Sequence, residues 1–332
     1  MTNSKPFFAG KHIEEIWQRY QPSDGPPEIL FHYTDAFALR SIVEASEIWA
    51  THYEYTNDAL ELKYGMNVAA DQIERRLARY RRSNKSFTRE EYVKDPSIVD
   101  KPSWVILDVV VSMVRNWPEI RLLFAEFFVS CFSANPDMLS QWRAYAANAS
   151  GYSIGFDSNS LSQIGVSGNK IDFMIDLIKV IYNPEIQAEV IDKALDWVCD
   201  YVDKNIFEVQ QERLEDAITN WCALLLGTVV GLSIRFKHPG FEEEDEWRLI
   251  IAPDVLDGLD LDTSIVETRV SNNRIVPFLK LAIEQSAIKN LTVGPKNNIA
   301  MMDPANDIAL RQLFRNAGKD IPRVIRSRTP FR

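Results

Sequence analysis

Glu28-Ile-Leu-Phe-His-Tyr-Thr34 is the stretch of this sequence from which the architecture is best worked out. Its branched and aromatic residues are typical of a short strand. Thr34 or Asp35 is suited to cap a helix over residues 36–45. The 27 residues before this strand include a turn-rich stretch at Pro22–Pro27 and are interpreted as a lead-in to the folded domain.

The same pattern of short strands and longer helices continues along the chain. Further strands are expected at 48–51, 127–133, 151–156, 246–251, 265–270 and 290–293. Helices are expected at 60–80, 105–114, 137–147 and 307–317, and the segment 174–235 is predicted to be helical. We therefore predict one α+β domain over residues 28–318, with a small mixed or antiparallel sheet, helical insertions near 59–125 and 174–232, and a basic tail at 319–332.

Composition excludes several classes of protein. Of 332 residues, 46% are hydrophobic and 25% are charged, which is typical of globular domains and excludes a disordered or collagen-like chain. The apolar runs at 104–114 and 223–232 end well before the ~20 residues that a bilayer span needs, and the N-terminus lacks a signal-peptide core. We expect a cytoplasmic protein without a membrane span. Cys131, Cys199 and Cys222 have no zinc-ligand spacing and are expected to be reduced.

The net charge of −10 argues against a general nucleic-acid-coating protein, but basic residues gather in two segments. Residues 73–89 hold seven basic residues and one acidic residue, and residues 311–332 hold the same numbers. Either these segments are solvated surfaces, or they form a binding surface for a polyanion. For the second alternative the candidate nucleic-acid contacts are Arg75, Arg79 and Arg82.

The usual catalytic and nucleotide-binding motifs are absent from the sequence. It contains no GxGxxG, no GxxxxGK[ST] and no Gly-x-Ser-x-Gly. The four histidines and three cysteines form no pair at ligand spacing, so no transition-metal site is predicted. A nucleotide, if one is bound, must be held in another way.

An acidic run enters an apolar strand at Phe241-Glu-Glu-Glu-Asp-Glu246-Trp-Arg-Leu-Ile250. If the strand begins near Glu244, then Glu244, Glu246 and Arg248 share one face, and the apolar residues share the other. A carboxylate beside the core needs a partner, and Arg248 is placed to supply one. The alternative is a solvated acidic loop with a Glu246–Arg248 pair at the surface.

Seven motifs in this order resemble the bacterial DUF2971 family. They are Phe31 to Thr34, Asn57-Asp58, Cys131 to Ser133, Trp142 with Tyr145, Gly151 to Phe156, Glu244 to Arg248, and Val293 to Pro295. The resemblance covers about residues 28–318 and carries no chemistry of its own.

A more distant resemblance does imply chemistry. His-Tyr-Thr followed by a Leu-x-x-Ile helix is similar to the opening of ADP-ribosyltransferase-like domains, including DNA-modifying toxins. In that superfamily three strands build the NAD pocket. The resemblance places His32 on the first strand, Ser133 on the second and Glu246 on the third, and it implies an ADP-ribosyltransferase-like sheet. The second motif is Cys-Phe-Ser instead of Ser-Thr-Ser, and a long insertion separates it from the third.

The roles that this resemblance implies suit the residue types. Glu246 would stabilise the oxocarbenium character that develops when the nicotinamide–ribose bond breaks, and Glu244 would activate the acceptor. The NAD-binding residues would be His32, Tyr33, Thr34, Ser133 and Tyr152, with Tyr33 or Tyr152 stacking on nicotinamide.

Three functions follow as alternatives. The first is an NAD-dependent ADP-ribosyltransferase-like effector of a phage-defence or toxin system, with nucleic acid or protein as acceptor and a neutralising partner protein. The second is a non-enzymatic nucleotide-sensing or interaction module. The third is a metal-dependent nuclease or hydrolase in which Asp58, Glu61 and the carboxylates of 242–246 bind Mg²⁺.

Overall fold

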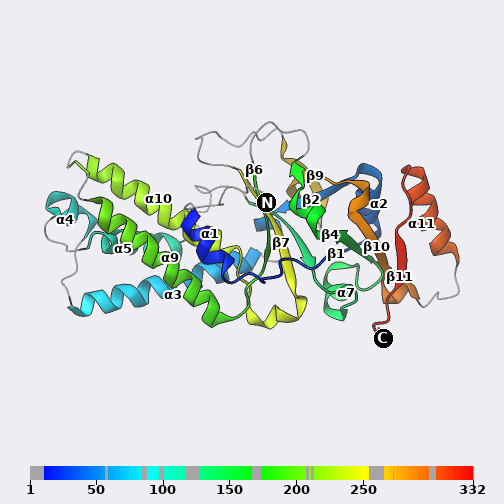
Figure 1. The fold of residues 1–332 in the computed structure, drawn as a ribbon, viewed down its shortest axis with the longest axis horizontal. Helices are drawn as coiled ribbons and strands as arrows, with labels where there is room; N and C mark the ends of the chain where they lie inside the picture. Colours follow the sequence, from blue (N-terminus) through cyan, green and yellow to red (C-terminus); the bar gives the residue numbers. More distant parts are fainter. Residues whose placement is uncertain are drawn as a thin grey trace. The chain divides into compact units, whose positions relative to one another are not determined.

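A computed structural model of the chain describes residues 11–56, 59–83, 88–96, 101–116, 127–166, 173–206, 209–210, 213–253, 265–271, 273–298 and 304–331. The chain divides into two compact units, each built from separate stretches of sequence (Figure 1). The helical unit comprises residues 1–21, 57–125 and 181–239, and the sheet unit comprises 22–56, 126–180 and 240–332. The segments expected as helical insertions fall mostly in the first unit, which also takes in part of the expected lead-in.

The helical unit is held together by long amphipathic helices. Helices α3 (Ala59–Ser83), α5 (Ser103–Arg115), α9 (Pro184–Asn205) and α10 (Leu214–Ser233) contact one another, while α1 (Lys11–Gln18) packs on α9 and α4 (Arg89–Lys94) on α5. On α3 the buried positions recur at helical spacing, at Leu62, Met66, Ala69, Ala70, Ile73 and Leu77. The helices expected at 60–80 and 105–114 are thereby confirmed.

Helix α10 is the one helix in the described part of the chain that is long and apolar enough to cross a membrane by length and composition. Most of its apolar window is buried inside the protein. Its buried residues include Leu225, Val229 and Leu232, which is the pattern of a core helix.

The sheet unit is built on an eleven-stranded sheet, counting the described residues, whose principal order is β11-β10-β4-β1-β3-β2-β9-β5. Strand β7 pairs with β3 and β6, and β8 pairs with β9. All pairs are antiparallel except β10 with β11. The strands are β1 (Ile29–Thr34), β2 (Glu47–His52), β3 (Phe128–Ser133), β4 (Tyr152–Asp157), β5 (Gly165–Val166), β6 (Phe173–Lys179), β7 (Glu246–Pro253), β8 (Glu267–Ser271), β9 (Arg274–Ala282), β10 (Ile288–Val293) and β11 (Arg323–Arg326).

One edge of β3 is shared by two strands, and the sheet opens between them. Strand β1 pairs with the C-terminal end of β3 through one residue pair, Phe31 with Ser133. Strand β2 pairs with the N-terminal end of β3, at Phe128 and Val129. The opposite edge of β3 pairs along its whole length with β7. Cys131 therefore lies in the gap that β1 and β2 leave along β3, and we call this opening the β1–β2 gap.

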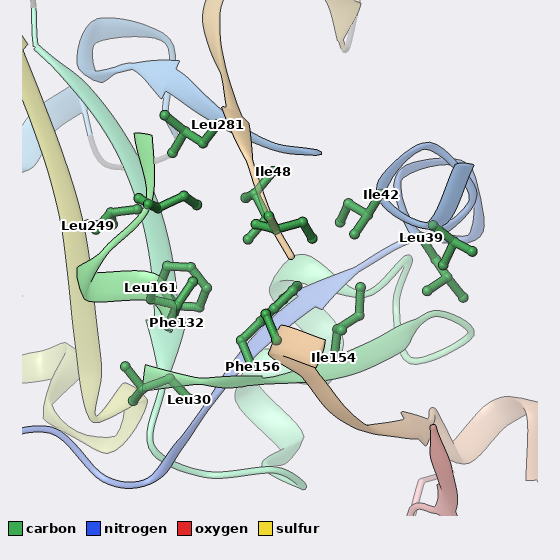
Figure 2. Packing of buried hydrophobic residues seen from close by; sticks show 14 of the residues in the cluster. Leu30, Leu39, Ile42, Ile48, Phe132, Ile154, Phe156, Leu161, Leu249 and Leu281 are labelled. Atoms are coloured by element: carbon green, nitrogen blue, oxygen red, sulfur yellow. The ribbon is translucent and has the colours of Figure 1, made fainter. Parts of the chain in front are cut away.

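The main core lies on one face of the sheet. Leu30, Phe132, Ile154, Phe156 and Leu249 alternate inward from their strands and pack together (Figure 2). Helices α2 (Ala36–Ala45) and α11 (Pro304–Asn316) add further apolar side chains to this cluster. Asp35 caps α2, because its carboxylate accepts from the backbone N–H of Ala38 at 2.8 Å.

The α+β class is confirmed, but the prediction of a small sheet is wrong. Residues 174–179, expected to be helical, form β6 beside β7, and no strand was expected where β9 lies. In β6 the buried Met174 and Ile178 are four positions apart, a spacing that fits a helix and a strand equally, so pairing with β7 decides the conformation. Pro277 within β9 weakens its strand pattern in the sequence.

The segment expected as a basic tail is part of the sheet unit. Strand β11 pairs with β10 in parallel, and the next residues bind Asp137, whose carboxylate accepts from the Arg328 N–H at 2.7 Å and from the Thr329 hydroxyl at 2.9 Å. Burial opposes ionisation of Asp137, but hydrogen bonds from Ser327 and its neighbours lower its pKa. Basic composition alone does not reveal such docking, since it depends on a carboxylate some 190 residues away in the sequence.

Candidate functional site

A small pocket opens on the sheet unit where β1, β3 and the start of β7 meet. It measures about 70 Å³ and is lined by Phe31, His32, Tyr33, Cys131, Phe132, Gln141, Tyr145, Glu244 and Glu246. Gln141 and Tyr145 come from α7 (Leu139–Tyr145). Drug-sized ligands occupy roughly 300–1,000 Å³, so the pocket has room for one ring or sugar and not for a whole dinucleotide. Four of the predicted site residues line it: His32, Tyr33, Glu244 and Glu246.

His32 lies in the β1–β2 gap, and its hydrogen bond defines the tautomer. Its Nδ1 is 2.9 Å from the carbonyl oxygen of Cys131, and because a carbonyl only accepts, Nδ1 carries the proton. Burial lowers the pKa of His32, the Cys131 bond opposes this, and the charge of Arg269 lowers it further. The ring is therefore neutral at pH 7, and Nε2 is an acceptor without a partner among the described residues.

Glu246 and Arg248 form a buried ion pair. Arg248 Nε lies 2.6 Å from Oε1 of Glu246, and a terminal guanidinium nitrogen lies 3.3 Å from Oε2. The two side chains are 4% and 5% exposed, so the interpretation as a pair at the surface is wrong. The prediction that Glu246 and Arg248 share one face of the strand is confirmed, because Trp247 and Leu249 belong to the core on the other face.

Glu244 lines the pocket from a 3-10 helix and not, as predicted, from the strand. The strand begins at Glu246, and Glu244 ends a 3-10 helix over Pro239–Glu244. Asp245 between them has a φ of 47°, which interrupts the extended backbone. The two carboxylates therefore line one pocket, but not as neighbours on one strand face.

Ser133 is fully buried beside the pocket and does not line it. It pairs with Glu246 across the β3–β7 ladder. Its hydroxyl donates to the Glu244 carbonyl at 2.8 Å and accepts from the Asn135 N–H at 3.1 Å. Ser133 therefore positions the segment that carries Glu244.

Tyr33 has its hydroxyl fixed by the backbone. It donates to the Asn135 carbonyl at 2.8 Å and accepts from the Met138 N–H at 3.0 Å. Burial is the main cause that raises its pKa. Its ring meets Trp142 edge-on, with centroids 4.8 Å apart, so only part of the ring is left to contact a ligand.

Thr34 and Tyr152, also predicted to bind NAD, do not line the pocket. They pair with each other across β1 and β4, and Tyr152 belongs to the main core. Sequence reasoning passed over other lining residues, namely Phe31, Cys131, Phe132, Gln141 and Tyr145. These residues belong to motifs that the sequence shows, but aromatic residues at such spacing are more often core residues and were not predicted to line a site.

The predicted nucleic-acid contacts lie on α3 of the helical unit. Arg75, Arg79 and Arg82 are exposed, recur at helical spacing, and make no hydrogen bond or ion pair within the described residues. Arg76 and Arg81 in the same helix are different, since they pair with Asp196 and Asp108. The three free cations therefore form a basic stripe along one face of α3.

Within the described residues no group of three or more His, Cys, Asp or Glu side chains is arranged to hold a metal ion. Asp58 lies outside those residues, and the side chain of Glu61 is not described, so the Mg²⁺ hypothesis stays a prediction. The three cysteines are free thiols.

Residues 141–249 match the sequence profile of DUF2971, a family described as proteins of unknown function. The matched segment contains the motifs at Trp142, Gly151–Phe156 and Glu244–Arg248, while the motifs at Phe31–Thr34, Cys131–Ser133 and Val293–Pro295 lie outside it. No curated protein matches the chain. No solved structure matches it.

Proposed function

We propose that the pocket binds one ring of the nicotinamide–ribose end of NAD and that the protein transfers ADP-ribose. The observation that carries this proposal is the convergence of His32, Glu244 and Glu246 on one pocket from separate segments of the sheet unit. Aromatic walls and carboxylates suit a flat ring joined to a sugar. The resemblance to ADP-ribosyltransferase-like domains supports the same assignment for His32 and Glu246.

Each of the three side chains has a distinct task in this reaction. Nε2 of His32 accepts a hydrogen bond from a ribose hydroxyl or from the carboxamide N–H. The Glu246 carboxylate, oriented by Arg248, stabilises positive charge that develops at the ribose. Glu244 accepts the proton of the attacking group.

The C1′–N bond breaks, and its electron pair neutralises the pyridinium ring, which leaves as nicotinamide. The nucleophilic atom of the acceptor bonds to C1′, and its proton passes to Glu244. With water as acceptor the products are ADP-ribose and nicotinamide.

His32→Ala tests this proposal in binding and in turnover. Titration of NAD into the wild-type protein should show saturable binding with release of nicotinamide, and the variant should bind at least about tenfold more weakly because it loses a buried acceptor. The pKa of His32 is lowered from its ordinary value of about 6.5, so the ring does not change charge between about pH 7 and 8. The affinity for NAD should therefore be constant over this range. Wild-type protein that neither binds NAD nor releases nicotinamide would refute the proposal.

The ion pair favours a second candidate, a nucleotide-binding module without turnover. Both oxygens of Glu246 already contact Arg248, which limits what the carboxylate can offer to a substrate. For such a module, NAD would bind with the same His32 dependence, and no nicotinamide would be released in any mixture with nucleic acid or protein.

The basic stripe on α3 favours nucleic acid as the acceptor. Reversing the charges of Arg75, Arg79 and Arg82 to Glu should weaken binding of single- or double-stranded DNA and reduce the slope of log K against log salt by about 2–3, since each phosphate contact contributes about 0.7–0.9. Binding isotherms over a salt series give this slope. An unchanged slope would identify the stripe as solvated surface.

A further inference from the structure

Arg269, which sequence analysis passed over, extends from β8 towards β2. Its Nη2 donates to the hydroxyl of Thr51 at 2.9 Å. The guanidinium carbon lies 5.4 Å from the ring centroid of Trp49 and 5.9 Å from that of Phe278. These contacts hold the planar cation in place beside the two rings.

The positive charge of Arg269 lacks a counter-ion among the described residues. The side chain forms no ion pair there, and its buried Nε has no hydrogen-bond partner. Asp35 is the nearby carboxylate that favours its charge, but Asp35 is engaged with the N-terminus of α2. A partly desolvated guanidinium without a paired anion is costly, so it is well suited to bind one.

This cation lies near the β2 end of the β1–β2 gap. Thr51, its hydrogen-bond partner, pairs with Val129 at the β2 end of the β1–β2 gap, and His32 lies within that gap. The charge of Arg269 is also near enough to contribute to the lowered pKa of His32. The charge of Arg269 therefore acts on the ring whose Nε2 is offered to a ligand.

We propose that Arg269 forms an anion subsite that binds a phosphate or pyrophosphate group of a nucleotide whose sugar end contacts His32. The identity of the ligand as a nucleotide rests on the proposed function, whereas the anion preference rests on the uncompensated cation. The small pocket accommodates one ring or sugar, so the phosphates must lie outside it. The guanidinium has the donor geometry that phosphate oxygens require.

Arg269→Gln tests the subsite, with Arg274→Gln as a matched control. Arg274 is exposed on β9 of the same hairpin and has no partner among the described residues. Calorimetric titrations with ADP-ribose, inorganic pyrophosphate and nicotinamide riboside separate the phosphate contribution from that of the sugar and ring. We expect Arg269→Gln to weaken binding of ADP-ribose and pyrophosphate by about 10–100-fold, and nicotinamide riboside to bind as before. Arg274→Gln should match wild type throughout.

The outcomes separate this inference from the proposed function. If ADP-ribose and pyrophosphate bind through Arg269 but NAD releases no nicotinamide, the subsite is supported and the transferase proposal fails. If wild type binds neither phosphate compound, or if both variants weaken binding equally, the subsite is refuted. Arg269→Lys, which keeps the charge but loses the planar donor geometry, should be intermediate, and melting curves establish that each variant is folded.

Discussion

Glu246→Gln is expected to reduce the rate of nicotinamide release from NAD by about 10²–10³-fold while leaving NAD affinity within a few-fold of wild type. The amide preserves size and still offers an oxygen to Arg248, but it removes the negative charge that stabilises the oxocarbenium-like transition state. Nicotinamide release measured at saturating NAD, with affinity measured by calorimetry, separates the two effects.

The variant needs a control because it breaks a buried ion pair. Loss of one partner from such a pair costs about 3–5 kcal/mol when it leaves the other charge unpaired, so melting curves must accompany the kinetics. Glu243→Gln makes the same chemical change at an exposed carboxylate that does not line the pocket, and it should leave rate and stability unchanged. Glu246→Asp keeps the charge near Arg248 and should be closer to wild type in stability. A folded Glu246→Gln protein with the wild-type rate would refute the proposed role of Glu246.

Gly151→Ala is expected to lower the free energy of unfolding by about 2–3 kcal/mol, the upper part of the typical range for an overpacked site. A Cβ at this position would lie 2.2 Å from the backbone oxygen of Thr34 and 2.9 Å from backbone atoms of Ala146. Both neighbours are backbone atoms, so no side chain can rotate away. Denaturant unfolding monitored by circular dichroism measures the difference.

Gly165→Ala is the matched control for this prediction. A Cβ there meets nothing within 4 Å, and the residue has no positive φ. Its stability should stay within about 0.5 kcal/mol of wild type. Equal stability of the two variants would mean that the close approach at Gly151 is relieved by backbone movement.

The motif that begins at Gly151 is recognisable in the sequence, but the physical reason for its glycine is found only in the tertiary structure. Gly151 immediately precedes β4, and its carbonyl accepts from the N–H of Gly294, whose own Cβ would lie 2.6 Å from the carbonyl oxygen of Ala149. The two glycine motifs are therefore one structural feature, a crossing of backbones beside α7. Their spacing of more than 140 residues hides this in the sequence.

Local chemistry predicted several elements directly. Strand β1, helix α2 with a cap at Thr34 or Asp35, and the alternation of Trp247 and Leu249 against Glu246 and Arg248 all follow from residue pattern over about ten positions. The structure identifies Asp35 as the cap. The α+β class follows from the same kind of evidence, because strand and helix periodicities differ over a few residues.

The sequence by itself thus determined the class of fold, the strands that carry His32 and Glu246, and the need of a buried carboxylate for Arg248. Tertiary structure decided that β6, β9 and β11 join the sheet, that Thr34 and Tyr152 pair away from the pocket, and that Arg269 reaches Thr51. The physical reason is range: propensity, capping and alternation act between near neighbours, whereas a pocket forms where strands distant in sequence diverge. At the β1–β2 gap, the backbone of β3 and the side chain of His32 meet across 99 positions of sequence.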